Sequence, residues 1–255
     1  MKTKNNLRKI LAILLACAMT LAFAACGASP ANGDKPADDG TIKIAIIKQL
    51  DHASLDEIAN AVAERLTEMN EAGEAKIEFS ISSGQNDQTI LKQLCDQAIA
   101  DKVDVIIPIA TTAAQVAALS AEGTGVKVVY AAVSDPESAK LTGIDYVSGT
   151  CDALNTEFII NMMLAQNPDV KKVGLLYSLS EPNSATPIAD AKTVLEAKGI
   201  EYVEQTANTN DEVVAAASAL IAAGVDAVFT PTDNVIMAAE LAIYENLAKA
   251  GIPHY

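Results

Sequence analysis

Residues 42–69, IKIAIIKQLDHASLDEIANAVAERLTEM, contain the first strand–loop–helix unit of the chain and indicate its fold class. The β-branched run Ile42–Ile47 predicts a buried strand, and Gln49–His52 is a polar loop. Leu55–Met69 then has helical spacing, because four apolar residues fall on one face: Ile58, Val62, Leu66 and Met69. A strand followed by an amphipathic helix of this length is the repeating unit of parallel α/β sheets.

The same unit recurs in two runs. The first run has predicted strands at 42–47, 76–81, 104–109 and 127–132, with helices at 55–69, 89–100 and 112–121. After an irregular stretch at 134–152, the second run has strands at 172–177, 201–206 and 225–230, with helices at 154–164, 184–198, 211–222 and 234–249. Two runs of about one hundred residues each predict an α/β fold of two doubly wound parallel-sheet lobes, lobe 1 at 41–140 and lobe 2 at 141–255.

The last residues, Gly251–Tyr255, begin like a strand after a helix. A domain seldom ends on the first residues of an interior strand, because the apolar partners of that strand would be exposed. We therefore expect lobe 2 to be incomplete, with a C-terminal part missing from this chain.

The first 25 residues have the features of an export signal. Basic residues precede an almost entirely apolar run, Ile10–Phe23, and small residues close it at Ala24–Gly27. This order predicts a cleaved signal peptide at 1–25. The cysteine at the cut, Cys26, resembles the lipobox of bacterial lipoproteins, which implies acylation of its thiol and anchoring to the outer face of the cell membrane. The alternatives to a lipoprotein are an ordinary secreted protein and an uncleaved anchor. Residues 26–40 are rich in Gly, Pro, Ser and Asp, which predicts a flexible tether.

The charge balance excludes binding of nucleic acid through bulk charge. The signal peptide holds four basic and no acidic residues, so its removal leaves 14 basic against 33 acidic residues and a net charge of −19. Cys95 and Cys151 remain in the mature chain without CxxC or Cys/His spacing, which argues against a metal site. Buried free thiols are expected for both, and a disulfide between them is the alternative in an exported protein.

Catalytic sequence patterns are not found. The chain has no G-x-G-x-x-G, P-loop, G-x-S-x-G or H-E-x-x-H motif, and its two histidines are His52 and His254. We therefore expect neither an enzyme nor a cofactor. An exported α/β enzyme that uses His52 is the distant alternative.

Polar loops follow the predicted strands, where ligands of open parallel sheets bind. Helix N-termini in these loops offer N–H groups for a carboxylate, and hydroxyls and carboxylates can add further contacts. The loops are Gln49–His52, Ser83–Gln88, Ala110–Ala113, Ser134–Pro136, Ser180–Ser184 and Pro231–Asn234. The same residue types commonly cap helices in any βα protein, so a helix cap is the more frequent role for each of them taken singly.

The order of these loops resembles one family, the ABC-transporter substrate-binding lipoproteins of the tryptophan/tyrosine-uptake type. The resemblance runs from about Ile42 to the end of the chain. It rests on seven stretches taken together: Ile47–Leu55, Asn86–Gln88, Ile109–Gln115, Tyr130–Pro136, Lys171–Tyr177, Pro182–Ser184 and Pro231–Asn234.

This resemblance implies a type I periplasmic-binding fold whose two lobes close over a small solute, typically an aromatic or other amino acid. The solute would be delivered to an ABC permease and its ATPase. Thr111, Thr112 and Ser134 would bind it from the first lobe, and Asn183, Ser184 and Asp233 from the second. Independently of the resemblance, the carboxylate of Asp135 or Asp233 could hold an ammonium group. His52, Gln85 and Asp87 would lie on the rim of the cleft. A sensor lipoprotein that presents its solute to a receptor kinase is the alternative use of the same fold.

Overall fold

The computed structural model describes residues 40–255. The predictions for the signal peptide, for Cys26 and for the tether up to Asp39 lie outside the described residues. Within residues 40–255, no helix is both long and apolar enough to cross a membrane.

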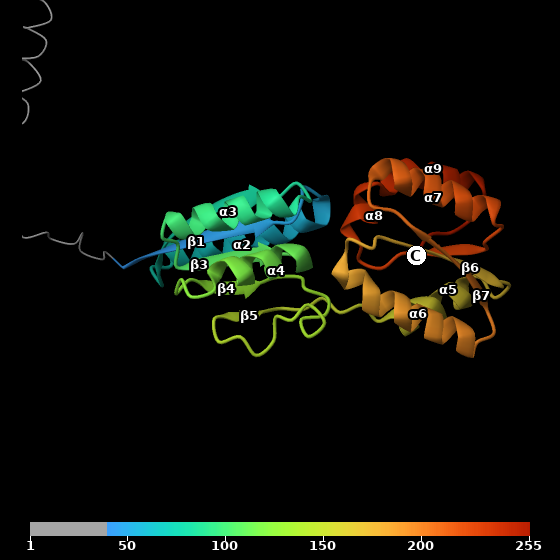
Figure 1. Cartoon of the computed structure of the whole chain (residues 1–255), viewed down its shortest axis with the longest axis horizontal. Coiled ribbons are helices and arrows are strands. Elements are labelled where there is room, and N and C mark those ends of the chain that lie inside the picture. The colour runs from blue at the N-terminus through green and yellow to red at the C-terminus, as the bar shows by residue number, and fades with distance from the viewer. Residues whose placement is uncertain (1–39) are drawn as a thin grey trace, which may run out of the picture. The chain divides into compact units, whose positions relative to one another are not determined.

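Five parallel strands form the first sheet, in the order β2-β1-β3-β4-β5 (Figure 1). The strands are β1 (Thr41–Lys48), β2 (Lys76–Ser83), β3 (Val105–Ile109), β4 (Lys127–Tyr130) and β5 (Val147–Gly149). The helices that connect the first four strands are α2 (Ala53–Glu71), α3 (Gln88–Ala100) and α4 (Thr111–Ala121). We call this sheet with its helices the first lobe.

Alternate side chains of β1 face opposite sides of the first sheet. Ile44 and Ile46 pack in one cluster with apolar residues of α2, whereas Ala45 and Ile47 pack in another with residues of α3 and α4. Because successive side chains of a strand point to opposite faces, helices cover both faces of this sheet.

Three parallel strands form the second sheet, in the order β7-β6-β8. The strands are β6 (Lys172–Tyr177), β7 (Glu201–Thr206) and β8 (Ala227–Phe229). The helices are α5 (Thr156–Gln166), the 3-10 helix η1 (Pro182–Ser184), α6 (Ala185–Ala197), α7 (Asn210–Ala222), α8 (Asn234–Ala238) and α9 (Glu240–Lys249). We call this sheet with its helices the second lobe. A parallel bridge between Val228 and His254 places the last residues beside β8, as the strand-like ending predicts.

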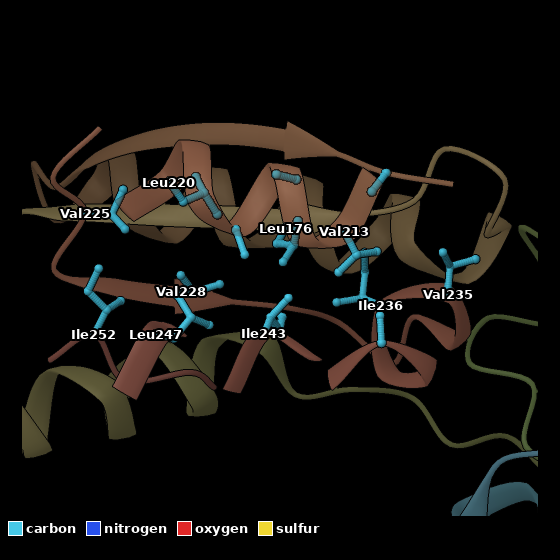
Figure 2. Packing of buried hydrophobic residues seen from close by; sticks show 14 residues of the cluster. Leu176, Val213, Leu220, Val225, Val228, Val235, Ile236, Ile243, Leu247 and Ile252 are labelled. Atoms are coloured by element: carbon cyan, nitrogen blue, oxygen red, sulfur yellow. The ribbon is translucent and has the colours of Figure 1, made fainter. Parts of the chain in front are cut away.

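The second lobe also has a core on each face of its sheet. Figure 2 shows Leu176 of β6 and Val228 of β8 among apolar side chains of α7 and α9, such as Leu220 and Leu247. On the other face, Phe229 of β8 packs with residues of α5 and α6. The predicted fold class is therefore confirmed: two lobes, each with a parallel sheet and helices on both faces.

Three details differ from the sequence prediction. β5 lies inside the stretch that we expected to be irregular, and it is short enough to leave little periodic signal. Because β5 pairs with β4, the first sheet extends beyond the expected lobe boundary at residue 140. The helix expected at 234–249 is interrupted at Ala239, which separates α8 from α9. Alanine is a strong helix former, so the sequence does not mark this break.

The two cysteines of the described residues are free and differ in exposure. Cys95 is buried in the core between α3 and the first sheet, and burial raises the pKa of its thiol to about 12. Cys151 follows β5 and is exposed, so the expectation that it is buried is wrong. Its position after an edge strand leaves it outside the core.

Candidate ligand-binding site

A cavity of about 200 Å³ lies where loops of the two lobes meet. Most of its lining comes from segments that follow strands, which is where ligands of parallel α/β sheets bind. The lining residues of the first lobe and the segment after it are His52, Ser54, Leu55, Ile58, Ala110, Thr111, Ala132, Ser134 and Asp152; those of the second lobe are Asn183, Thr232, Asn234 and Met237.

Four of the nine predicted ligand-binding residues line this cavity: His52, Thr111, Ser134 and Asn183. Ser134 Oγ lies 3.2 Å from Thr232 Oγ1, which is a hydrogen bond between the two lobes. His52 also caps α2, because its Nδ1 accepts a hydrogen bond of 3.3 Å from the backbone N–H of Ser54. The structure therefore brings these four residues of the two lobes together at one cavity, and their binding of a solute stays a prediction.

Asn183 presents an unsatisfied acceptor in the cavity wall. Its Nδ2 donates to the backbone carbonyl of Thr232 at 2.6 Å, which fixes the orientation of the amide. Its Oδ1 is buried and accepts no hydrogen bond from the described residues. A buried polar atom without a partner costs about 1–3 kcal/mol. An ammonium or hydroxyl group of a ligand can remove this cost by donating to Asn183 Oδ1.

The start of α4 forms another part of the wall. Ala110 precedes the helix and gives it no side-chain cap, and Thr111 begins it. A helix start carries a partial positive charge, which favours a carboxylate nearby. Ala110 and Ala132 both have positive φ, 78° and 54°, which is uncommon for residues other than glycine. Such backbone outliers cluster at binding sites, and both of these line the cavity.

Asp233 does not line the cavity, so our prediction that it holds an ammonium group of the solute is not supported by its position. The residue is fully buried, and its Oδ2 accepts from Ser178 N at 2.6 Å and from Ser184 Oγ at 2.7 Å. Its Oδ1 accepts from Val235 N and Ile236 N, both at 3.1 Å, and so caps α8. Burial raises the pKa of this carboxyl, against these hydrogen bonds. Ser184 is likewise fully buried behind the wall, bonded to Asp233.

The remaining three predicted residues lie outside the cavity lining. Thr112 is buried at the start of α4, where its backbone N–H donates to Gln49 Oε1 at 3.2 Å. Gln85 is exposed and donates to Asp51 at 3.0 Å. Asp87 is exposed and caps α3, and the hydrogen bonds from the first turn of that helix lower its pKa. Asp87 is therefore a helix cap, which is the alternative role that the sequence also allows.

Sequence reasoning missed four polar residues of the lining: Ser54, Asp152, Thr232 and Asn234. Thr232 and Asn234 flank Asp233 in a loop that the sequence does single out, but no local signal shows which of the three faces the cavity. Asp152 lies in the stretch expected to be irregular. Asp152 is exposed, and among the residues that line the cavity it is the one with a carboxylate side chain.

Sequence reasoning also missed two buried residues that join the lobes. Gln49 is fully buried, and its Nε2 donates to Glu181 Oε1 at 2.6 Å. Glu181 Oε2 accepts from Asn234 Nδ2 at 2.8 Å. Burial, together with the nearby negative charge of Asp233, raises the pKa of Glu181 to about 7. Both residues lie in loops that the sequence places after strands, but no sequence pattern distinguishes either residue from its neighbours in the loop.

Metal chemistry has no obvious site in the part of the chain that the structure describes. No group of three or more His, Cys, Asp or Glu side chains is placed there to hold a metal ion. The cavity instead offers hydroxyls, amides, one exposed carboxylate and the start of α4, which suit a small polar or zwitterionic molecule.

Comparison with known proteins places these features in a family. A tyrosine-binding protein of Clostridioides difficile (strain R20291) is 28% identical over 243 residues, which cover 92% of this chain and 70% of that relative. The ABC domain in complex with L-Trp from Streptococcus pneumonia is 26% identical, with a TM-score of 0.77 over 84% of this chain and 73% of that one.

A second solved structure is the ligand-free, open form of a substrate binding protein with adhesive properties from Clostridium difficile. It is 25% identical, with a TM-score of 0.57 over 84% of this chain and 73% of that one. The family model of ABC transporter substrate binding proteins matches residues 43–255, nearly all of the described chain. With its two parallel-sheet lobes and the cavity between their loops, the chain belongs to the family of ABC transporter substrate binding proteins that this model describes, and it has the type I periplasmic-binding fold.

Proposed function

We propose that this protein captures an aromatic amino acid outside the cytoplasm and delivers it to an ABC permease and its ATPase. The observation that carries the proposal is Asn183 Oδ1, a buried acceptor without a partner in the wall of the cavity between the lobes. The ammonium group of an amino acid supplies the missing donor. The ligands named for two relatives, tyrosine and L-Trp, support an aromatic side chain.

The polar groups of the cavity suit the two charges of an amino acid. The partial positive charge at the start of α4, beside Thr111, favours the carboxylate, whereas Asn183 Oδ1 and Asp152 favour the ammonium group. Apolar side chains, among them Ile58 and Met237, are available to the side chain of the solute. Binding energy shared between the lobes stabilises their closed arrangement, which is the form that the permease recognises.

The test is thermal stabilisation of the full-length protein by L-tyrosine, L-tryptophan, nucleosides and sugars. A ligand that binds only the folded state adds roughly 2.7 kcal/mol at one hundred times its dissociation constant. We expect stabilisation by the aromatic amino acids, and its loss in Asn183→Ala but not in Asn246→Ala, an exposed asparagine of α9. Stabilisation by sugars or nucleosides alone contradicts the amino-acid assignment.

The same proposal places the protein at the outer face of a bacterial membrane. Residues 1–25 act as a signal peptide, acylated Cys26 anchors the protein to the outer face of the bacterial membrane, and the tether up to residue 40 separates the lobes from the membrane. Incorporation of labelled palmitate in a bacterial host tests the anchor. We expect label in the wild type and none in Cys26→Ser, and equal labelling of both proteins contradicts lipidation at this residue.

A further inference from the structure

Glu181 occupies an unusual position for an acidic side chain. It follows β6, only 3% of it is exposed, and both side chains that donate to it are uncharged amides, Gln49 and Asn234. The neighbouring charge that acts on it is that of Asp233, which has the same sign. A buried carboxylate without a cation is costly, and such residues are enriched at functional sites.

The two amides connect Glu181 to opposite walls of the cavity. Asn234 lines the cavity from the second lobe. Gln49 belongs to the first lobe, where its Oε1 accepts from the N–H of Thr112 in the first turn of α4. Its Nε2 also donates to Asn86 Oδ1 at 2.9 Å, so Gln49 joins the loops after β1 and β2.

We infer that Glu181 is a positioning residue of the solute cavity, which holds Asn234 and, through Gln49, the start of α4 in their binding arrangement. This inference rests on the proposed function. The hydrogen bond between Glu181 and Gln49 joins residues 132 positions apart and requires the lobes to be close together. The TM-score of the chain is also higher against the L-Trp complex of the streptococcal relative, 0.77, than against the ligand-free, open clostridial structure, 0.57. Both comparisons cover the same shares of each chain.

Separation of the lobes would return Glu181 to water, where its charged form is no longer penalised. The closed form therefore takes up a proton more readily than the open form, and falling pH favours closure. The groups that face Glu181 are Asp233 and Asn234 at the start of α8 and Gln49 from the first lobe. Because burial raises the pKa of Glu181 to about 7 in the closed form, we expect the solute to bind about tenfold more weakly at pH 8 than at pH 6.

The experiment measures the affinity of the full-length protein for L-tyrosine and L-tryptophan at pH 6 and pH 8 by calorimetry. Glu181→Gln keeps an acceptor for Gln49 but cannot ionise, so we expect affinity near that of the wild type at pH 6 with little change at pH 8. Glu181→Ala is expected to bind at least tenfold more weakly than the wild type at pH 6. Glu201→Gln, an exposed residue at the start of β7, controls for charge and should keep the wild-type profile.

The positioning role is overturned if Glu181→Ala binds as tightly as the wild type, or if Glu181→Gln keeps the wild-type pH dependence. If the wild type binds neither amino acid, the proposed solute is wrong, and thermal melts without ligand test the contact itself. The effects of Gln49→Ala and Glu181→Ala on the melting temperature should then be non-additive, because the two side chains share one hydrogen bond. Strictly additive effects would refute the inference independently of any solute.

Discussion

Replacement of Asp233 by alanine distinguishes a structural carboxylate from a ligand-binding one. The side chain makes four hydrogen bonds, to Ser178, Ser184, Val235 and Ile236, and it is fully buried. Asp233→Ala removes all four acceptor contacts at once. We therefore expect a large loss of stability even in the absence of any solute.

The magnitude follows from the groups that lose their acceptor. Loss of an N-cap costs about 1 kcal/mol, which applies to the first turn of α8. Ser178 N and Ser184 Oγ belong to residues that are 1% and 0% exposed, and each unpaired buried donor costs about 1–3 kcal/mol. Removal of a desolvated carboxylate offsets part of this cost. The expected net loss is about 3–5 kcal/mol, which lowers the melting temperature by roughly 6–20 °C for a folded unit of this size.

Circular dichroism melts of the wild type, Asp233→Ala and Ser184→Ala measure this effect without ligand. Ser184→Ala removes one of the four hydrogen bonds and should lose about 1 kcal/mol. Asp169→Ala, an exposed aspartate before β6, is the control and should melt as the wild type does. An unchanged melting temperature in Asp233→Ala, together with lost solute binding, would refute the structural role and restore the ligand-binding role that the sequence suggested.

Three further predictions concern pH, backbone packing and thiol reactivity. Because the folded-state pKa of Glu181 is raised to about 7 from 4.5, its contribution to stability is fully present below pH 4.5 and is lost as pH rises through 7. Melts from pH 5 to pH 8 should show this decline, and Glu181→Gln should flatten it. Gly149→Ala should destabilise the fold by about 1–3 kcal/mol in denaturant titrations, because its Cβ would lie 2.2 Å from the carbonyl oxygen of Tyr130. A thiol reagent followed by mass spectrometry should label exposed Cys151 in the native protein and Cys95 only after denaturation; labelling of both in the native state would contradict the burial of Cys95.

The fold was predictable because its signals are local and repeated. Strands such as β1 and β3 are rich in β-branched residues, and helices such as α2 have apolar residues at helical spacing, so the order of elements follows from the sequence. β5 escaped prediction since three residues that include Gly149 carry no period. The break at Ala239 escaped because tertiary packing overrides the propensity of alanine for helix.

The candidate site was predictable as a set of loops, but the roles of individual residues were not. Ser184 and Asp233 lie in the expected loops, yet their side chains face each other in the interior rather than the cavity. Gln49 and Glu181 are 132 positions apart, and their pairing follows from how the lobes meet. A sequence shows that a polar residue follows a strand, whereas its direction depends on contacts with distant segments.

Helix caps explain much of this ambiguity. The polar residues before α2, α3 and α8 are His52, Asp87 and Asp233, and each satisfies the first N–H groups of its own helix. A side chain used in this way has less capacity to bind a solute. Ala110 before α4 provides no such bond, and α4 begins in the cavity wall. At α4 a distant residue takes over part of this role, because Gln49 Oε1 accepts from the N–H of Thr112 in the first turn. The residues next to a helix start therefore do not show by themselves whether its N–H groups are satisfied within the protein or by a ligand.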